Sequence, residues 1–137
     1  MYLNCKTYFS YRYGTFSTEA LVKEGVELGA TAMALTNINN TSDLWDFHDL
    51  CNGASIRSIL GCEIRNEDEL LYILIAKSRA GVGEINRLLT LHLQQKNPFP
   101  SRPQLDPDVW VIYPLGKRNP AELRDGELIG VQPAEVN

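Results

Sequence analysis

The sequence lacks the patterns of several protein classes. It has no surplus of basic residues, and its formal charge of -4 gives no overall field that would attract nucleic acid. Cys5, Cys51 and Cys62 lie far apart and form no CxxC pair, which is typical of reduced, small core thiols rather than of a disulfide framework or zinc site. No apolar run is long enough to span a bilayer, and the N-terminus has no signal-peptide pattern. We therefore expect a cytoplasmic protein that does not enter a membrane.

The length and hydrophobic content of the chain are sufficient for one hydrophobic core. The chain has 137 residues, of which 44% are hydrophobic, so its length fits a single domain or a piece of one. The first half alternates strand and helix patterns, with strands expected at 2–9, 31–36 and 58–64 and helices at about 17–29 and 43–51. This order predicts parallel strands joined by right-handed crossover helices, with the loops after the strands at one common rim.

The second half continues the alternation. A strand is expected at 70–76 and a helix at about 83–95, which completes the clear βαβ units of residues 1–95. Residues 96–107 contain four prolines and are expected to form a stiff exposed connection. Residues 108–137 are expected to form a further strand, a short helix and a strand. The chain stops at "PAEVN", which looks like the opening turn of another helix, so we expect residues 1–137 to be excised from a longer protein.

Several side chains have both a structural and a functional interpretation. Trp45 and Trp110 fall in apolar-periodic segments and are expected in the core, whereas His48 and His92 are expected at the surface or core edge rather than as ligands. The aromatic loop "YFSYRYGTF", residues 8–16, includes the segment Tyr8–Tyr13 and could stack on single-stranded bases. Packing of these tyrosines over the mouth of the fold is the interpretation that the negative net charge favours.

A family resemblance rests on five stretches, which keep their order and spacing: "TYFSYRYG", "LVKEGVELGATAMALTN", "ILGCEI", "LLYILIAKS" and "INRLLTLHL". They resemble the N-terminal polymerase-and-histidinol-phosphatase (PHP) domain of the bacterial DNA polymerase III alpha subunit. The resemblance implies an α/β fold, the first part of a distorted TIM-like barrel with mostly parallel strands and crossover helices. It also implies a longer domain, of which this chain would be the N-terminal portion.

The resemblance further implies a metal-binding cluster at the rim. Its ligands would be His-x-His after the first strand, Asp-His after "ALT", Glu after "GC" and His at the start of the next strand. In this sequence these positions hold, in chain order, Asn4, Lys6, Asn37, Ile38, Glu63 and Leu71. Only the glutamate is retained, and one glutamate cannot hold a divalent or multinuclear centre. We therefore expect a degenerate metal site without catalytic residues or bound cofactor.

Lys6 changes the electrostatics of that position. An ammonium group would repel a cation directly, and we hypothesise that it replaces the metal's charge by pairing with Glu63 and bonding to Asn4 or Asn37. A solvated lysine at a strand end is the equally weighted alternative. Glu63 is expected to be structural rather than a general base, and the thiols of Cys5 and Cys62 are expected to be inert.

These residues favour a structural role. The first hypothesis is a non-catalytic scaffold within a DNA polymerase that acts in DNA replication, where nucleotidyl transfer belongs to later domains. Its partners would be the remainder of the alpha chain, DNA and a proofreading exonuclease subunit. The alternatives are a metal-dependent phosphoesterase or 3′–5′ exonuclease completed by the missing half of the domain, which would use a divalent metal, and a module that binds single-stranded nucleic acid.

Overall fold

The fold is known from a computed structural model that describes residues 1–135. The chain divides into two compact units, Met1–Cys62 and Glu63–Asn137. The elements are β1 (Tyr2–Cys5), α1 (Thr18–Glu27), β2 (Ala32–Leu35), α2 (Leu44–Gly53), β3 (Arg57–Asn66), β4 (Glu69–Ala76), α3 (Arg79–Gln95), β5 (Val109–Pro114), η1 (Pro120–Glu122), β6 (Glu127–Gly130) and η2 (Pro133–Glu135). None of the helices described is both long and apolar enough for a membrane span. The turn expected at "PAEVN" corresponds to η2, and its last two residues lie outside the described part of the chain.

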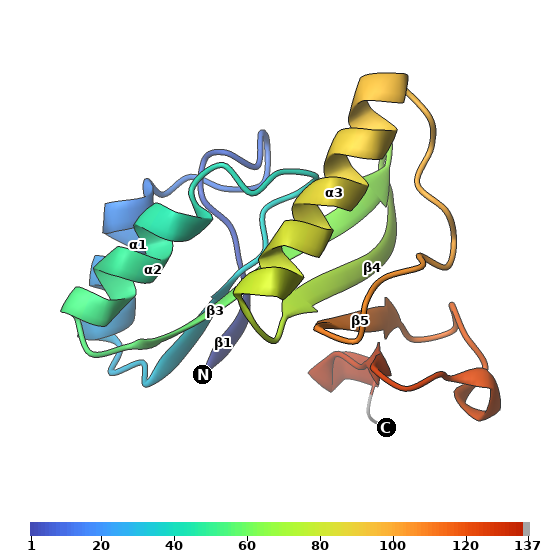
Figure 1. Ribbon diagram of the computed structural model, residues 1–137. Coiled ribbons are helices and arrows are strands. Elements are labelled where there is room, and N and C mark those ends of the chain that lie inside the picture. The colour runs from blue at the N-terminus through green and yellow to red at the C-terminus, as the bar shows by residue number, and fades with distance from the viewer. Residues whose placement is uncertain (136–137) are drawn as a thin grey trace. The chain divides into compact units, whose positions relative to one another are not determined.

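The first unit is built on parallel strands. β1 pairs in parallel with β2, and β2 pairs in parallel with the first half of β3. All four residues of β2 are buried, as expected for a strand that is covered on both faces. Helices α1 and α2 lie side by side, and each follows one strand and precedes the next (Figure 1). The predicted α/β class with parallel strands and crossover helices is therefore confirmed, although β1 ends at Cys5 instead of continuing to residue 9.

Helix α1 buries a narrower stripe than its sequence suggests. The Oγ atom of Ser17 accepts a hydrogen bond from the Ala20 amide at 3.1 Å and caps the helix as predicted. Val26 and Leu28, which the apolar pattern places on the inner face, are more than half exposed. Gly25 lies inward instead, where a Cβ atom would come within 2.2 Å of Met33 Sδ. A side chain at position 25 would therefore have to displace the end of the Met33 side chain.

Both tryptophans lie at the surface, contrary to the prediction. In α2 the buried stripe is Leu44, Phe47 and Cys51, which follow the helical spacing of apolar residues, and Trp45 faces away from it with 43% of its area exposed. In β5 the residues alternate, so Trp110 points outward between buried valines. The Lys77 ammonium lies 3.8 Å from the centroid of its ring. A large apolar side chain therefore stays exposed when its position in the helix or strand repeat points toward solvent.

The second unit contains the end of β3 and the strands β4 to β6. β4 is antiparallel to β5, whereas β5 is parallel to β6. Helix α3 packs on β4 and β5 and buries Ile85, Leu88 and Leu89 as predicted. It begins at Arg79, four residues before the expected start, because the Ser78 side chain caps it through the Gly81 amide at 3.3 Å.

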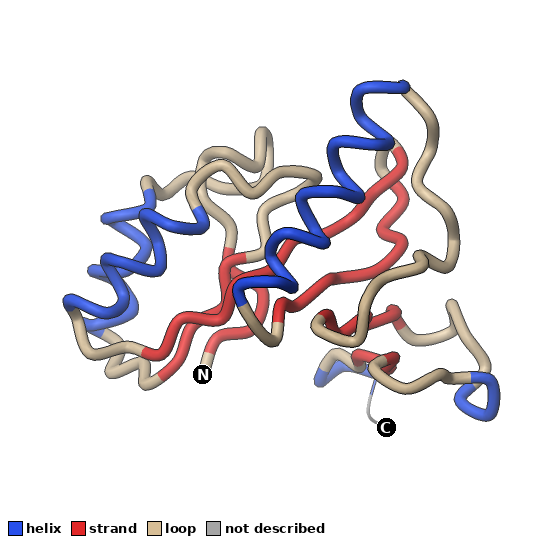
Figure 2. Tube along the Cα trace, viewed as in Figure 1, coloured by secondary structure: helices blue, strands red, loops and turns tan. Residues whose placement is uncertain are grey.

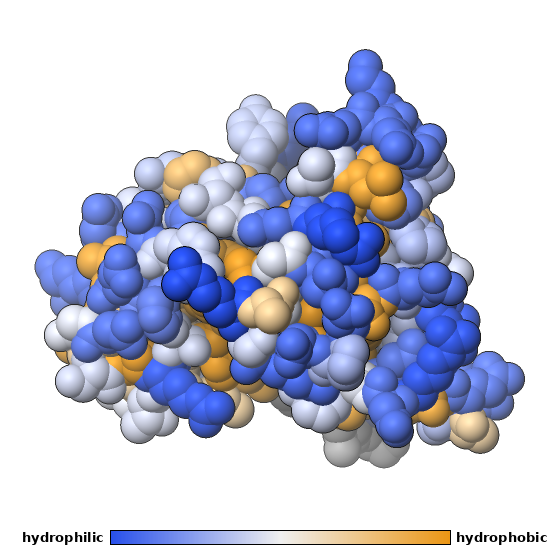
Figure 3. All heavy atoms as spheres, viewed as in Figure 1, coloured by the Kyte–Doolittle hydropathy of each residue, from blue (hydrophilic) through white to orange (hydrophobic). Residues whose placement is uncertain are grey.

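The connection between α3 and β5 is only partly exposed. It runs as a long loop (Figure 2), yet Phe99 and Pro103 are buried. Asn66 fixes Phe99 by donating to its carbonyl at 2.9 Å and accepting from its amide at 2.8 Å. The prediction of an exposed connection is therefore wrong for these residues, because an asparagine at the end of β3 satisfies the backbone. In the view of Figure 3, hydrophilic residues cover most of the surface and hydrophobic ones show as small patches between them.

Candidate functional site

The loops after β1 and β2 lie at the same end of the first unit (Figure 2), where the sequence predicts the rim. Asn4 stands at the centre of one contact between them. Its Oδ1 atom accepts hydrogen bonds from Lys6 Nζ and from Thr36 Oγ1, both at 2.6 Å. Lys6 thus reaches one of the two asparagines that the sequence offered as partners. We name the polar side chains joined here and below the rim network: Asn4, Lys6, Thr7, Ser10, Thr18, Thr36, Asn37 and Asp43.

Asn37 forms the buried hub of the rim network. Its Oδ1 atom accepts from the Thr7 amide at 3.0 Å and from Ser10 Oγ at 2.7 Å. Its Nδ2 group donates to Thr7 Oγ1 at 3.0 Å and to Asp43 Oδ1 at 2.8 Å. Only 1% of the residue is exposed. Both ends of the amide are therefore saturated by protein groups, which is the condition for burying a polar side chain without a net cost.

Asp43 is the buried charge of the rim network. Its Oδ2 atom accepts from Thr7 Oγ1 and Thr18 Oγ1 at 2.8 Å each, and Oδ1 accepts from Asn37. Although Asp43 occupies the N-cap position of α2, its side chain makes no capping hydrogen bond. The carboxylate instead ties the β1 loop, α1 and the β2 loop together.

The sequence interpretation missed most of this network. Thr7, Ser10, Thr18 and Asp43 are not among the predicted site residues. All four lie in the segments that join β1 to α1 and β2 to α2, or at the first helical residue after them, and this position in the chain is the signal that the sequence offers. Ile38 is half-buried and takes part through its backbone amide, which donates to Ser10 Oγ at 2.9 Å. Its side chain contributes no ligand.

Glu63 and Leu71 belong to the second unit. The carboxylate of Glu63 is buried and forms an ion pair with Arg65 Nε, while Leu71 is a buried residue of β4. Arg65 is a partner that the sequence interpretation did not consider. The pairing of Glu63 with Lys6 stays a prediction.

The donor set does not fit a divalent metal. Among the positions implied by the resemblance, those of the first unit supply two amide side chains, an ammonium and an aliphatic chain. The amide of Asn37 is already saturated, and Lys6 carries a positive charge. Within residues 1–135, no group of three or more His, Cys, Asp or Glu side chains could hold an ion. Hard cations need several free anionic oxygens, and nitrogen-preferring ions need imidazoles.

The cysteines near the rim are poor nucleophiles. Burial raises the pKa of the Cys5 thiol, and the nearby Lys6 opposes this only in part. Burial raises the pKa of Cys51 to about 11. Cys62 is buried and donates to the Asn37 carbonyl at 3.3 Å. A thiol acts as a nucleophile when it is ionised and accessible. Burial therefore favours the inert role expected of Cys5 and Cys62, and Cys51 is a buried core residue.

The two histidines have structural neighbours. His48 Nδ1 lies 2.7 Å from Ser58 Oγ, and the ring meets Trp45 edge-on at 5.9 Å. The ring of His92 packs against Phe99 with centroids 5.1 Å apart. Neither joins a cluster of acidic or sulfur ligands in the described part of the chain.

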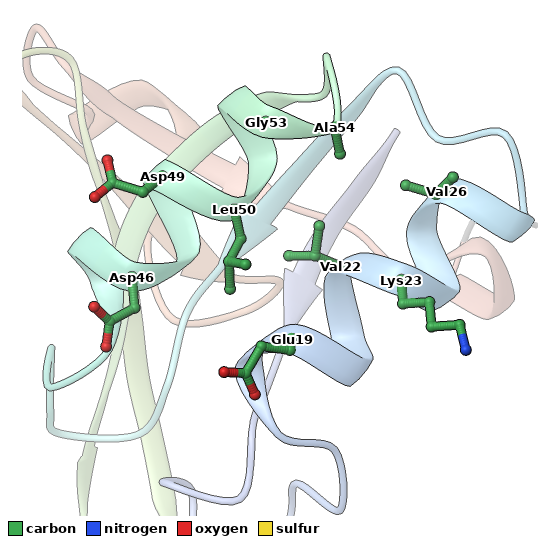
Figure 4. A pocket seen from close by; sticks show the side chains of 9 residues that line it. All are labelled: Glu19, Val22, Lys23, Val26, Asp46, Asp49, Leu50, Gly53 and Ala54. Carbon is green, nitrogen blue, oxygen red and sulfur yellow. The ribbon is translucent and has the colours of Figure 1, made fainter.

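A surface groove of about 640 Å³ lies between α1 and α2. In Figure 4, Val22 and Leu50 point toward one another across it, whereas Lys23 points away. Carboxylates at its edge come from Glu19, Asp46 and Asp49. The groove contains none of the residues predicted from the sequence as site residues, and the residues that line it include no serine, threonine, cysteine or histidine.

The most perturbed carboxylate is structural. Hydrogen bonding to the Arg102 guanidinium, and further bonds from the Arg124 amide and the Tyr113 hydroxyl, lower the pKa of Glu127 to about 2. So acidic a group is a poor base near neutral pH. Because Arg102 also donates to the Glu122 carbonyl at 2.8 Å, this cluster instead fastens the connection before β5 to β6.

Comparison with known proteins identifies relatives of this sequence. The PHP domain family matches residues 3–121. An error-prone DNA polymerase of Aromatoleum aromaticum is 32% identical over 91 residues, which are 65% of this chain and 8% of the relative. An error-prone DNA polymerase of Symbiobacterium thermophilum is 32% identical over 97 residues, 70% of this chain and 9% of the relative. The chain thus spans less than a tenth of the length of these relatives.

A solved structure shares the fold at low sequence identity. It is that of an amidohydrolase from Chromobacterium violaceum with bound sulfate and no metal. The TM-score is 0.52 at 9% identity, and the alignment covers 85% of this chain and 67% of the other. The likeness concerns the fold alone.

Proposed function

Because the chain belongs to the PHP domain family, we propose that it is the N-terminal portion of a polymerase-associated PHP domain whose metal site is degenerate and whose role is that of a scaffold. The observation that carries the proposal is the state of Asn37. At this position the resemblance implies a metal-binding aspartate. In this chain both the oxygen and the NH₂ group of the Asn37 amide are fully used in hydrogen bonds to Thr7, Ser10 and Asp43. The rim is held by protein groups in place of an ion.

The charge at the rim supports the same role. Lys6 brings a fixed positive charge to a position where the resemblance implies a histidine ligand, and its ammonium bonds to Asn4. Because the Lys6 ammonium is part of the chain, the positive charge at this position does not depend on a bound metal ion. Thr36, directly after the neighbouring strand β2, bonds to the same oxygen, so the contact joins β1 to the end of β2 and stabilises the strand ends.

The parent protein is part of the proposal. The relatives are named error-prone DNA polymerases and are more than ten times as long as the aligned segment. We propose that the parent is a bacterial DNA polymerase in which nucleotidyl transfer occurs elsewhere in the chain. The partners would then be the rest of that chain, DNA through the parent protein and a proofreading exonuclease subunit.

Hydrolysis assays test the proposal. The chain is incubated with Mn²⁺ or Zn²⁺ and either a 3′-labelled single-stranded oligonucleotide or a phosphate monoester. No release above that of the Glu63→Ala variant is expected. Hydrolysis that depends on the metal and disappears in Glu63→Ala would replace the scaffold by a phosphoesterase or exonuclease.

A further inference from the structure

The aromatic loop does not pack over the fold as the sequence interpretation favoured. Tyr8, Phe9, Tyr11, Tyr13 and Phe16 are all between 42% and 83% exposed. Five exposed rings within nine residues are a concentration of exposed aromatic surface, and exposed apolar surface of this kind can mark an interaction site. The scaffold role proposed above does not use them.

The backbone beneath the rings is held in place. The Tyr8 amide donates to the Phe16 carbonyl at 2.8 Å, and the Gly14 amide donates to the Ser10 carbonyl at 3.0 Å. A Cβ atom on Gly14 would lie 1.9 Å from the Thr7 carbonyl oxygen, so the turn closes only with glycine. Thr7 and Ser10 point inward to Asn37, and the rings point outward from this base. A preorganised surface loses little conformational entropy on binding.

The rings offer flat faces beside a cation. Tyr8 and Phe9 stack with centroids 4.9 Å apart and an interplanar angle of 24°. The guanidinium carbon of Arg12 lies 5.7 Å from the centroid of the Tyr11 ring. Nucleobases stack on such rings whatever their sequence, and an adjacent arginine can contact the phosphates.

The charge of the aromatic loop and its flanking residues distinguishes between possible binding partners. Residues 1–18 include Lys6 and Arg12 and no aspartate or glutamate, whereas the whole chain carries a charge of -4. This segment itself carries two positive charges and no negative one, although the Asp43 carboxylate lies beneath it and accepts hydrogen bonds from Thr7 and Thr18. A polyanion is attracted to it, while the same loop of a second copy, carrying the same charges, is repelled.

We propose that the aromatic loop binds single-stranded nucleic acid by stacking bases on its tyrosines and placing phosphates near Arg12. Base stacking on exposed aromatic residues does not read sequence. The site is therefore expected to accept different sequences and to bind more weakly as salt rises.

Fluorescence anisotropy tests the site with the whole 137-residue chain. Labelled oligothymidylate and oligouridylate of about 12 nucleotides are titrated between about 50 and 200 mM salt. A chelator is present throughout, so the result is independent of metal binding and of the proposed scaffold role. The variants are Tyr11→Ala, Tyr11→Phe and Arg12→Gln. Trp45→Ala is the matched control, because this ring is exposed on α2, outside the loop.

The expected result is binding that Tyr11→Ala weakens by roughly 5-fold to 100-fold, as measured for base–aromatic stacking. Tyr11→Phe and Trp45→Ala keep the affinity of the original chain, and Arg12→Gln lowers the salt slope by about 0.7. Binding to either oligonucleotide supports the proposal.

Three results would overturn the proposal. They are no binding at the lowest salt, equal affinities for the original chain and Tyr11→Ala, and self-association that Tyr11→Ala abolishes without any oligonucleotide binding. The last would assign the rings to a second copy. Circular dichroism checks that the variants are folded, and a ring that is 83% exposed is removed without opening a cavity.

Discussion

Asn37 Nδ2 donates to Asp43 Oδ1 at 2.8 Å, and both residues are almost completely buried. This bond links the second residue after β2 to the residue directly before α2. It places the one buried carboxylate of the rim network against an amide. The stability of the first unit is therefore expected to depend on this pair.

Removal of the Asp43 carboxylate tests that dependence. Asp43→Ala leaves the hydroxyls of Thr7 and Thr18 and the Asn37 amide without their common acceptor, and we expect a loss of about 3 kcal/mol in the free energy of unfolding. Asp46→Ala on the exposed face of α2 is the matched control and should change it by less than about 0.5 kcal/mol. Urea denaturation measures both, and equal effects would contradict the assigned role of Asp43.

Asn37→Asp places two carboxylates in contact. Their repulsion raises the pKa of the pair in the folded state above the unfolded value of about 3.9. A raised folded pKa means that stability is retained at low pH and lost as pH rises through the folded pKa. The variant should thus be less stable than the original chain at neutral pH, and the difference should shrink as pH falls toward 4. Urea denaturation across this range measures it, and a difference that does not vary with pH would contradict the contact.

Glu127 gives the opposite pH dependence. Its folded pKa is lowered to about 2, chiefly by Arg102, from an ordinary value of 4.5. The stability it contributes is therefore complete above pH 4.5 and is lost as pH falls toward 2. Glu127→Gln should be less stable than the original chain at neutral pH and should show a smaller loss across this acid range. Thermal denaturation at several pH values checks this, and identical acid sensitivity of the two chains would assign the loss to other groups.

Two buried tyrosines offer a matched comparison. Within the described residues the Tyr72 hydroxyl has no hydrogen-bond partner, whereas that of Tyr113 donates to Glu127 Oε1 at 3.2 Å. Tyr72→Phe should keep or raise the free energy of unfolding, by up to about 1 kcal/mol, because it removes an unsatisfied group. Tyr113→Phe should lower it by about 1.5 kcal/mol. Denaturation of both variants provides the measurement, and a larger loss in Tyr72→Phe would show that its hydroxyl has a partner.

Much of the fold could be predicted because its elements are periodic. Leu44, Phe47 and Cys51 follow the helical repeat, and the apolar run of β2 has the length of a buried strand. Predictions failed where a contact between distant segments decides. Gly25 lies inward because Met33 is close, and Phe99 is buried because Asn66 binds its backbone. The spacing of apolar residues along the chain predicts neither contact, because each joins residues of different elements.

The position of the rim could be predicted from the sequence, but the side chains that bond to one another there could not. Strand ends located Asn4 and Asn37, since parallel strands bring their loops to one rim. The partners of these residues depend on side-chain orientation, so Thr7 and Asp43 could not be selected from other short polar residues. The prediction that the tyrosines of the aromatic loop pack over the fold was wrong, because it relied on the net charge of the whole chain, which does not determine whether a ring is buried.

The central claim is that hydrogen bonds have replaced a metal at the rim, and calorimetric titration tests it most directly. The purified chain, freed of metal, is titrated with Mn²⁺ and with Zn²⁺, and Glu63→Ala and Asp49→Ala are titrated in parallel. The account predicts no site-specific binding to any of the three proteins. Tight binding that is lost in Glu63→Ala and kept in Asp49→Ala would contradict it and would show a functional metal site.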